Sequence, residues 1–381
     1  MKKEDPFAYF ADSIEYELGF AEEEKSKGRK IVGIYCEYTP REIFLAAGAL
    51  PVCLCGTSNS TITEAEKVLP SNLCPLIKSS FGYFISKSCP FIEMADLIVA
   101  ETTCDGKKKM YEIMAESKRV EVLELTQRSA SKEALKHWTS ELKRLRKVVE
   151  KEFGVKITDA KLSAAIKEMN KERRLMEKAL RLGMHRPSVV TGKELSLLRF
   201  RIAGFKKHTE MLEKFIREIE ERISQKKFVA PKNSPRIILT GCPTGQGSEK
   251  LIEIIEECGG TVVCQEACSG IKSVYLQVDE KRDPIEAIAE RYFKLPCSCL
   301  TPNKGRFELL AKLAEDFKAD GIVDLVWQAC HTYNIESYLV GEFSKKELGL
   351  PFMKIETDYS HSDREQIKVR IGAFIEMLKN N

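Results

Sequence analysis

Two stretches of the sequence repeat one arrangement, in which an Ala-Asp pair precedes an apolar run and a cysteine follows that run. The first is "ADLIVAETTC", residues 95–104, and the second is "ADGIVDLVWQAC", residues 319–330. In both, the apolar run is nearly continuous, as is typical of a strand buried on both faces of a parallel sheet. A chain that ends two such strands with Cys104 and Cys330 is expected to contain one α/β unit twice.

The segments around both stretches alternate between strand and helix patterns. Strands are predicted over residues 30–36, 50–56, 96–104 and 120–125, and again over residues 236–242, 261–268, 320–330 and 351–358. The predicted helices between them include residues 40–49, 61–70, 248–259, 284–293, 305–317 and 362–378, the last with Ser362 as its N-cap. Strand–helix–strand order implies parallel sheets with crossover helices.

The composition changes between residues 131 and 230, where charged residues alternate with apolar ones at helical spacing. This segment is predicted to be a helical insert or lid. The expected fold is therefore α/β, with two similar doubly wound parallel-sheet domains, residues 1–130 and 231–381. The insert, residues 131–230, separates them, and a metal cleft is expected at the domain interface.

Bulk composition excludes several classes of function. The chain has 381 residues, 43% hydrophobic and 31% charged, which indicates a globular protein of about two or three domains. No apolar run approaches the roughly 20 residues of a membrane span, and the N-terminus lacks the pattern of an export signal. We therefore expect a cytoplasmic protein that does not enter the membrane. A net charge of +4 does not point to nucleic acid.

The 13 cysteines are unusual for such a chain. Without an export signal they should stay reduced, and many reduced thiols suggest metal ligands or redox chemistry. The alternative is that cysteine serves as a small buried residue. Cys53, Cys258 and Cys264 fit that alternative, because they lie within predicted strands or helices rather than at their ends.

The other cysteines occupy matching positions in the two α/β units. The matching pairs are Cys36 with Cys242, Cys55 with Cys268, and Cys104 with Cys330, and Cys74 has a rough counterpart in Cys297 or Cys299. In doubly wound sheets, ligands bind beyond the carboxyl ends of the strands. Two such domains facing each other would bring at least six thiols into one cleft.

The spacing of the thiols favours iron over zinc. Structural zinc sites use local CxxC pairs, and this chain has none; its nearest approach is Cys297-Ser298-Cys299. Thiolates spread over two domains suit an iron–sulfur cluster. The usual ferredoxin spacing is also absent, so the fold must assemble any cluster site.

Other motifs are weaker. The glycines of "GCPTGQGSEK", residues 241–250, match neither a P-loop nor a dinucleotide-binding loop, although the segment is a candidate for holding an anion or a cluster at a helix N-terminus. Among the histidines, only His331 adjoins a candidate ligand. His137, His185 and His208 fall in the helical insert and are expected at the surface.

Several longer motifs together resemble one known group of proteins. They are "YCEYTPREIFLAAGALPV", "NLCPLIKSSFGY", "CPFIEMADLIVAETTCDGKKKMYE", "TGCP", "PCSCLTPN", "DGIVDLVWQACHTYNIES" and "IETDYS". The chain is similar over nearly its whole length to the double-cubane cluster proteins, in the superfamily of 2-hydroxyacyl-CoA dehydratases and benzoyl-CoA reductases.

The resemblance implies a cofactor and partners. Dehydratase subunits hold one 4Fe–4S cluster on three cysteines, which would correspond here to Cys36, Cys74 and Cys330. Double-cubane relatives hold an 8Fe–9S cluster on six cysteines, form homodimers and reduce small molecules. Both receive electrons from a separate ATP-hydrolysing 4Fe–4S activator protein.

The surplus of thiols over three favours the double-cubane branch. The six expected ligands are those that the repeat selects, with three in reserve: Cys36, Cys74, Cys104, Cys242, Cys299 and Cys330, then Cys89, Cys268 and Cys297. His331 and Glu42 are candidate proton donors, although either could instead have a structural role.

Three rival interpretations remain at this point. The chain could be the 4Fe–4S subunit of a 2-hydroxyacyl-CoA dehydratase, with a second subunit and a CoA pocket. It could be a non-catalytic iron–sulfur electron carrier. It could also be an α/β protein with structural zinc.

Overall fold

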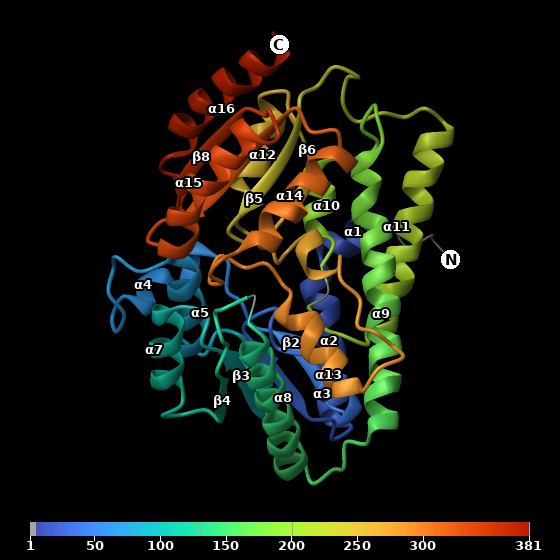
Figure 1. Cartoon of the computed structure of the whole chain (residues 1–381), viewed down its shortest axis with the longest axis vertical. Coiled ribbons are helices and arrows are strands. Elements are labelled where there is room, and N and C mark those ends of the chain that lie inside the picture. Colours follow the sequence, from blue (N-terminus) through green and yellow to red (C-terminus); the bar gives the residue numbers. More distant parts are fainter. Residues whose placement is uncertain (1–4, 130, 200, 381) are drawn as a thin grey trace.

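The structure, a computed structural model, describes residues 5–129, 131–199 and 201–380, and these residues contain two parallel sheets of four strands each (Figure 1). The strand orders are β2-β1-β3-β4 and β6-β5-β7-β8, so the two sheets have the same topology. The strands are β1 Ile31–Ile34, β2 Leu50–Cys53, β3 Leu97–Glu101, β4 Val120–Leu123, β5 Arg236–Gly241, β6 Thr261–Glu266, β7 Gly321–Trp327 and β8 Phe352–Thr357. The predicted fold class of two similar parallel-sheet units is confirmed.

The helices fall into three sets along the chain. The first set is α1 Pro6–Ala11, α2 Ser13–Ser26, α3 Arg41–Ala46, α4 Ile62–Ala65, α5 Pro75–Ile85, α6 Pro90–Met94 and α7 Asp105–Met114. The second is α8 Lys132–Phe153, α9 Asp159–Leu180, α10 Gly192–Leu197 and α11 Lys206–Ser224. The third is α12 Lys250–Glu257, α13 Pro284–Phe293, α14 Lys304–Asp316, α15 His331–Lys346 and α16 Arg364–Lys379.

The two sheets share part of their core. Every residue of β3 and of β7 is buried, which agrees with their continuous apolar sequences. One buried cluster includes Ile31 and Leu50 from the first sheet and Ile237 and Leu239 from the second. Beyond the carboxyl ends of β2 and β5, the Thr57 hydroxyl donates to the carbonyl oxygen of Gln246 at 3.0 Å, so these ends of the two sheets meet at a common boundary.

The helices between the sheets begin and end at recognisable caps. The hydroxyl of Ser131 accepts a hydrogen bond from the backbone of Ala134 at the start of α8, and Gly154 ends that helix with φ of 63°. Thr158 caps α9 in the same way, and α10 begins with a capping box. Helical periodicity and cap residues together explain why this part of the sequence was predictable.

Helix α9 runs beside both sheets (Figure 1). It packs against α3 near the first sheet, and Arg181 just beyond its end pairs with Asp316 of α14 at 2.9 Å. Helix α13, from the third segment, packs against α8 and α9. The domain boundaries stay predictions. Residue 130, the predicted end of the first domain, lies outside the described residues.

Two local predictions are wrong. The N-cap of α16 is Asp363 rather than Ser362. At the start of this helix, the Asp363 carboxylate accepts hydrogen bonds from the Lys250 ammonium and the Thr357 hydroxyl. The Ser362 hydroxyl instead forms a hydrogen bond with the hydroxyl of Ser360. His208 is not at the surface but 1% exposed.

His208 is buried because α11 turns this face toward the N-terminal helices. Its ring lies 5.0 Å from that of Phe10 and 6.0 Å from that of Tyr9, edge-on to both. Burial lowers its pKa from 6.5 to about 3. Between these two pKa values the ring is therefore neutral in the folded protein and protonated in the unfolded chain.

This burial predicts a loss of stability in acid. Between about pH 6.5 and 3 the unfolded state binds one more proton at His208, so the free energy of unfolding falls as pH falls through this window. From pH 6.5 to 4.5 the contribution is about 2–3 kcal/mol. Urea unfolding of His208→Phe should show a correspondingly smaller acid loss than wild type. The control His137→Gln, on a partly exposed residue of α8, should match wild type; equal slopes for all three proteins would contradict the prediction.

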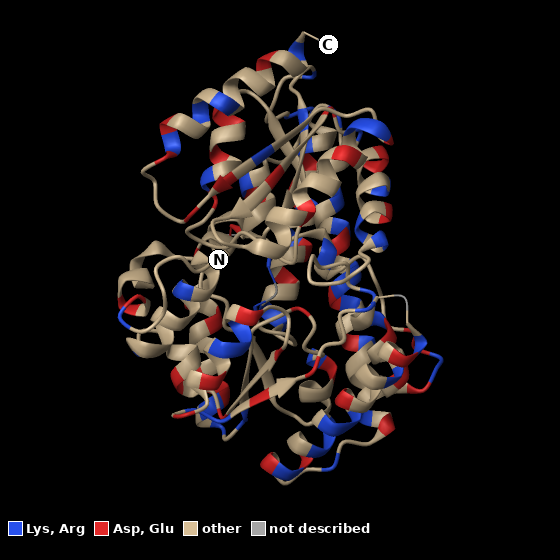
Figure 2. Cartoon of the chain, turned by 60° about the vertical axis from the view of Figure 1, so that its left-hand side comes forward, with Lys and Arg blue, Asp and Glu red and all other residues tan. Residues whose placement is uncertain are grey.

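Charged side chains of both signs are interspersed along the outer helices (Figure 2). None of the helices in the described part of the chain has the length and apolar content needed to cross a bilayer.

Candidate metal centre

Cysteines follow the carboxyl ends of strands in both sheets, at corresponding places. Cys36 lies two residues after β1 and Cys242 directly follows β5, its topological equivalent. Cys104 and Cys330 each lie three residues after the equivalent strands β3 and β7. The sequence repeat thus corresponds to a structural repeat.

Two of these thiols, and Cys74 as well, also begin helices. Cys74, Cys104 and Cys330 are the N-cap residues of α5, α7 and α15. The positive end of the helix dipole favours a thiolate there, although in this structure the Cys330 thiol and burial raise the pKa of Cys74, and burial raises the pKa of Cys104. Ligation of iron requires the thiolate, so these positions are chemically suited to it.

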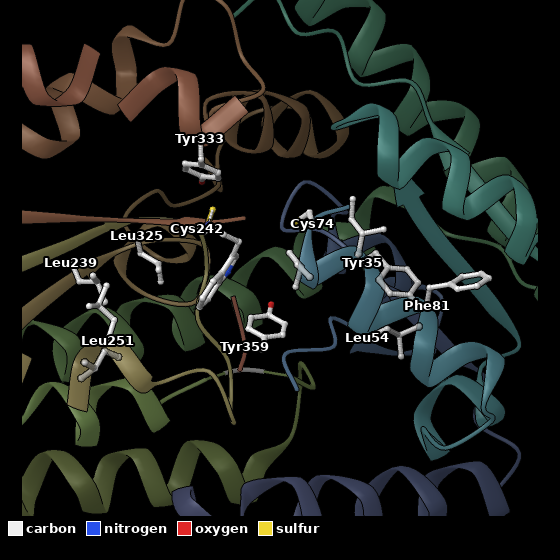
Figure 3. Close-up of a cluster of buried hydrophobic side chains, with 14 of the residues drawn as sticks. Tyr35, Leu54, Cys74, Phe81, Leu239, Cys242, Leu251, Leu325, Tyr333 and Tyr359 are labelled. Atoms are coloured by element: carbon white, nitrogen blue, oxygen red, sulfur yellow. Dashed lines mark hydrogen bonds between the residues drawn. The ribbon is translucent and has the colours of Figure 1, made fainter. Parts of the chain in front are cut away.

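A first group of thiols contains Cys74 from one sheet unit and Cys242 and Cys330 from the other. Hydrogen bonds from the thiols of Cys242 and Cys74 hold the pKa of Cys330 well below its usual value. The backbone N–H of Trp327 points at the Cys242 sulfur, 3.4 Å away. Figure 3 shows Cys74 and Cys242 approaching the boundary from opposite sides, with Tyr333 and Tyr359 nearby.

A second group is centred on Cys36. Its neighbours are Cys268 and Cys297, which both raise the pKa of the buried Cys36 thiol further, and Cys299. A hydrogen bond from Cys299 lowers the pKa of Cys297 to about 6. As in the first group, thiols from both sheet units meet at the boundary.

The remaining thiols have distinct places. Burial raises the pKa of Cys104, and the charges of Cys330 in the first group and Cys297 in the second raise it further, so Cys104 lies within electrostatic range of both groups. Cys89 begins the short helix α6, outside both groups as defined, and burial raises the pKa of its thiol. Cys53, the last residue of β2, packs against a buried apolar cluster as the sequence pattern predicted, and the neighbouring Cys55 thiol lowers the pKa of Cys53 to about 6.

A cavity of about 180 Å³ lies beside the second group. Cys36, Cys53, Cys55 and Cys268 contribute to its wall. The first sheet unit, the middle helices and the second sheet unit all provide lining residues, so the cavity exists only in the assembled fold. Its remaining polar lining is dominated by cations: Arg41, Lys107, Arg173, Arg199 and Arg201.

The two predicted proton donors lie apart from this cavity. Glu42 is fully buried, and its carboxylate pairs with Arg173 at 2.6 Å and accepts a hydrogen bond from the Tyr292 hydroxyl at 2.7 Å. Although burial opposes it, Arg173 lowers the pKa of Glu42, so this group stays a carboxylate and its geometry argues against proton donation. His331 is exposed at the first position of α15, next to Cys330. Both catalytic roles stay predictions.

A buried ionic network supports the second sheet near the thiols. Arg306 is completely buried and contacts Glu266, Asp324 and Glu336. Glu266 also pairs with Lys272 at 2.6 Å, and the charge of Lys272 acts on Cys268 and Cys297. This network fixes the residues behind the second thiol group.

The donor set fits an iron–sulfur group better than a single metal ion. In the described ranges, no three His, Cys, Asp or Glu side chains are arranged to hold one ion. The converging side chains are thiols in two groups, on helix N-termini and strand ends, with a backbone N–H directed at one sulfur. Thiolates with such hydrogen bonds are the usual protein ligands of iron–sulfur clusters.

Sequence patterns missed the charged lining of the cavity. Lys107 follows Cys104 in "CDGKKK", and nothing in that run distinguishes it from Lys108 and Lys109. Arg199 and Arg201 lie in the segment after α10, where helical periodicity stops. Only for Cys53 was a signal present, because it forms a Cys-Leu-Cys pair with Cys55 at a strand end.

Comparison with known proteins gives consistent matches over most of the chain. The family model for "2-hydroxyglutaryl-CoA dehydratase, D-component" matches residues 36–378. An Escherichia coli (strain K12) protein named "Putative dehydratase subunit YjiM" is 42% identical, with 93% of each chain covered. The (R)-phenyllactyl-CoA dehydratase beta subunit of Clostridium sporogenes is 28% identical, with 92% of each covered. A benzoyl-CoA reductase subunit of Thauera aromatica is 23% identical, with 93% of this chain and 92% of the relative covered.

Proposed function

The chain belongs to the 2-hydroxyglutaryl-CoA dehydratase D-component family, and from this premise we propose that it is an iron–sulfur reductase that acts on a small molecule at a double-cubane 8Fe–9S cluster. The proposal rests above all on one observation: two groups of thiols, each drawn from both sheet units, lie at one boundary. A subunit with a single three-cysteine cluster would need only one such group.

We propose that the six ligands come from these two groups and from Cys104, which lies within electrostatic range of both. This pool contains the six ligands expected from the repeat, and it adds Cys268 and Cys297 as alternates. Cys89 lies outside it. When bound, the cluster supplies single electrons at low potential.

The residues around the thiols have separable tasks. The N-termini of α5, α7 and α15 favour the thiolate form, and the Trp327 N–H stabilises charge on Cys242. Buried aromatic residues, Tyr35, Trp327 and Tyr359 among them, keep water from the sulfurs.

The ATP-hydrolysing activator would be a separate 4Fe–4S protein, since the sequence of this chain carries no nucleotide-binding motif. We propose a homodimer as the working form.

A second candidate is the 4Fe–4S subunit of a 2-hydroxyacyl-CoA dehydratase. The resemblance assigns its three ligands to Cys36, Cys74 and Cys330, of which Cys74 and Cys330 lie in the first thiol group and Cys36 in the second. A relative is named as a dehydratase beta subunit, which favours this candidate. A non-catalytic electron carrier is the third candidate, with the same thiols and no turnover.

We expect turnover to depend on ATP and on the thiols. Protein purified without oxygen would be mixed with the activator of the same organism, ATP and a strong reductant, and reduction of small unsaturated or nitrogen-containing molecules would be followed. The rate should vanish without ATP and again in Cys104→Ser. Cys264→Ser, in the interior of β6, is the matched control and should retain the rate.

Three outcomes would redirect the proposal. Turnover that survives Cys104→Ser would mean that this thiol does not serve the catalyst. Dehydration of a 2-hydroxyacyl-CoA in the presence of a second subunit would establish the dehydratase candidate. Reduction of the cluster with no turnover of any substrate would favour the electron carrier.

A further inference from the structure

One buried tyrosine hydroxyl beside the first thiol group has no protein partner in the described part of the chain. Tyr359 is 3% exposed, and its hydroxyl oxygen is buried and makes no hydrogen bond to any residue that the structure describes. Its side chain belongs to the same buried cluster as Cys74 and Cys242. Figure 3 shows the hydroxyl directed toward the side of the ring on which these two cysteines lie. The hydroxyl therefore points at the candidate metal centre and not at solvent.

The electrostatic environment of Tyr359 agrees with this placement. Burial raises the pKa of Tyr359 well above its usual value, and the thiols of Cys74 and Cys242 raise it further. Tyr359 thus lies within electrostatic range of two of the three thiols in the first group. Because a tyrosine hydroxyl carries its proton at neutral pH, it can donate one hydrogen bond to a negatively charged sulfur.

The residues around Tyr359 hold its ring in place. The ring packs edge-on against that of Trp327, with 4.8 Å between the centroids. The indole N–H of Trp327 donates to the carbonyl oxygen of Pro243 at 3.0 Å, which fixes the tryptophan in turn. On the other side, the carbonyl oxygen of Ser360 accepts a hydrogen bond from the Lys250 ammonium at 2.6 Å. None of these contacts uses the Tyr359 hydroxyl, so they orient it without satisfying it.

The repeat shows that the fold does not require a hydroxyl at this position. In each sheet the last residue of the outer strand, Leu123 of β4 or Thr357 of β8, pairs with the last residue of the neighbouring strand. Two residues further on, the first sheet unit has Leu125 and the second has Tyr359, and both are buried. An apolar side chain is therefore sufficient in the first unit. Because burying a hydroxyl without a hydrogen bond costs free energy, the hydroxyl in the second unit is expected to have a partner.

We propose that the Tyr359 hydroxyl donates a hydrogen bond to a sulfur of the iron–sulfur group that Cys74, Cys242 and Cys330 would hold. The inference rests on the proposed function, because it requires a cluster on these thiols. A cluster gains negative charge when it is reduced, so a hydrogen bond to one of its sulfurs stabilises the reduced form more than the oxidised form. Tyr359 would thus raise the reduction potential of the centre without being one of its ligands.

The test compares the reduction potential of wild type with that of Tyr359→Phe, as full-length protein purified without oxygen. Phenylalanine keeps the ring against Trp327 and removes only the hydroxyl. At a given potential we expect an about tenfold smaller ratio of reduced to oxidised cluster, which is a midpoint about 59 mV more negative for a one-electron couple. A redox titration followed by electron paramagnetic resonance measures the midpoint. The iron content should equal that of wild type, because the hydroxyl is not a ligand.

Two further variants serve as control and as replacement. Tyr275→Phe removes a hydroxyl that donates to the carbonyl oxygen of Lys294 at 3.4 Å, and Tyr275 packs against other apolar clusters than the one that contains the first thiol group. Its potential should equal that of wild type. Tyr359→Leu copies the residue of the first sheet unit and should shift the potential in the same direction as Tyr359→Phe. It replaces Tyr359→Phe if that variant does not fold, as judged by circular dichroism.

The outcomes separate this inference from the proposed function. An unchanged potential in a folded Tyr359 variant with full iron content would overturn the hydrogen bond, even if ATP-dependent reduction of a small molecule continues. Loss of iron from both folded variants would mean that Tyr359 is needed to assemble the site, and the proposed tuning would again be overturned. A more negative potential in the variant, in a protein that reduces no substrate, would support the hydrogen bond and contradict the proposed function. Wild type without iron would contradict both.

Discussion

Cys330→Ser is expected to lose about half or more of the iron that wild-type protein holds after purification without oxygen. Cys330 faces Cys74 and Cys242 across the boundary and begins α15, and both neighbouring thiols lower its pKa, so its loss removes the most acidic thiol of the first group. Wild type itself should hold about eight iron atoms per chain, with matching sulfide. Colorimetric iron and sulfide assays measure both quantities.

Cys258→Ser is the control for this experiment. Cys258 ends α12, and its thiol lies 3.7 Å from the carbonyl oxygen of Lys368, so serine there should leave the iron content unchanged. About four iron atoms in wild type would favour the dehydratase subunit. Zinc in place of iron, or equal iron in both serine variants and wild type, would contradict the assignment of Cys330.

Arg306→Met should lower the free energy of unfolding by about 3–5 kcal/mol. Arg306 is completely buried and contacts the carboxylates of Glu266, Asp324 and Glu336, so its removal leaves three buried acidic groups without this partner. Its guanidinium also lies over the ring of Tyr333, 5.0 Å from the centroid. Urea unfolding followed by circular dichroism would give the midpoint and slope for variant and wild type.

Arg282→Met tests whether the position, rather than the residue type, causes the effect. Arg282 pairs with Glu290 on the surface, with half of its side chain exposed, and such pairs contribute about 0–1 kcal/mol. A loss of similar size in both variants would show that the buried network has no special contribution. The loss of stability should be larger for Arg306→Met than for Arg282→Met, because water solvates the charges left at the surface but not those left in the interior.

Arg306→Met should also disturb the positions of the thiols that the second sheet unit presents. Tyr333 contacts both Arg306 and Lys272, and the charge of Lys272 acts on Cys268 and Cys297 of the second thiol group. The buried ionic network thus supports the scaffold on which the second sheet unit presents its cysteines. This connection links the stability of the fold to the geometry of the candidate centre.

The fold was largely predictable from the sequence because its signals are local. Continuous apolar runs such as that of β7 indicate buried parallel strands, and Ser131 and Gly154 mark the ends of α8 by their capping chemistry. The repeat of Ala-Asp, strand and cysteine predicted two equivalent units, and the matching strand orders confirm it. Which of two neighbouring polar residues becomes the N-cap of a helix was less predictable, since Asp363 rather than Ser362 begins α16.

By itself, the sequence determined which residues could hold a metal, because the position of a cysteine at a strand end follows from local pattern. Which of these thiols meet was decided only by the tertiary structure, where Cys74 reaches Cys242 and Cys330 from the other sheet unit. The burial of His208 and the inward turn of Lys107 were decided there too, since each depends on helices distant in the chain. Helical periodicity shows which face of a helix is apolar. Which other element covers that face, and which charged side chains become buried beneath it, depends on long-range packing.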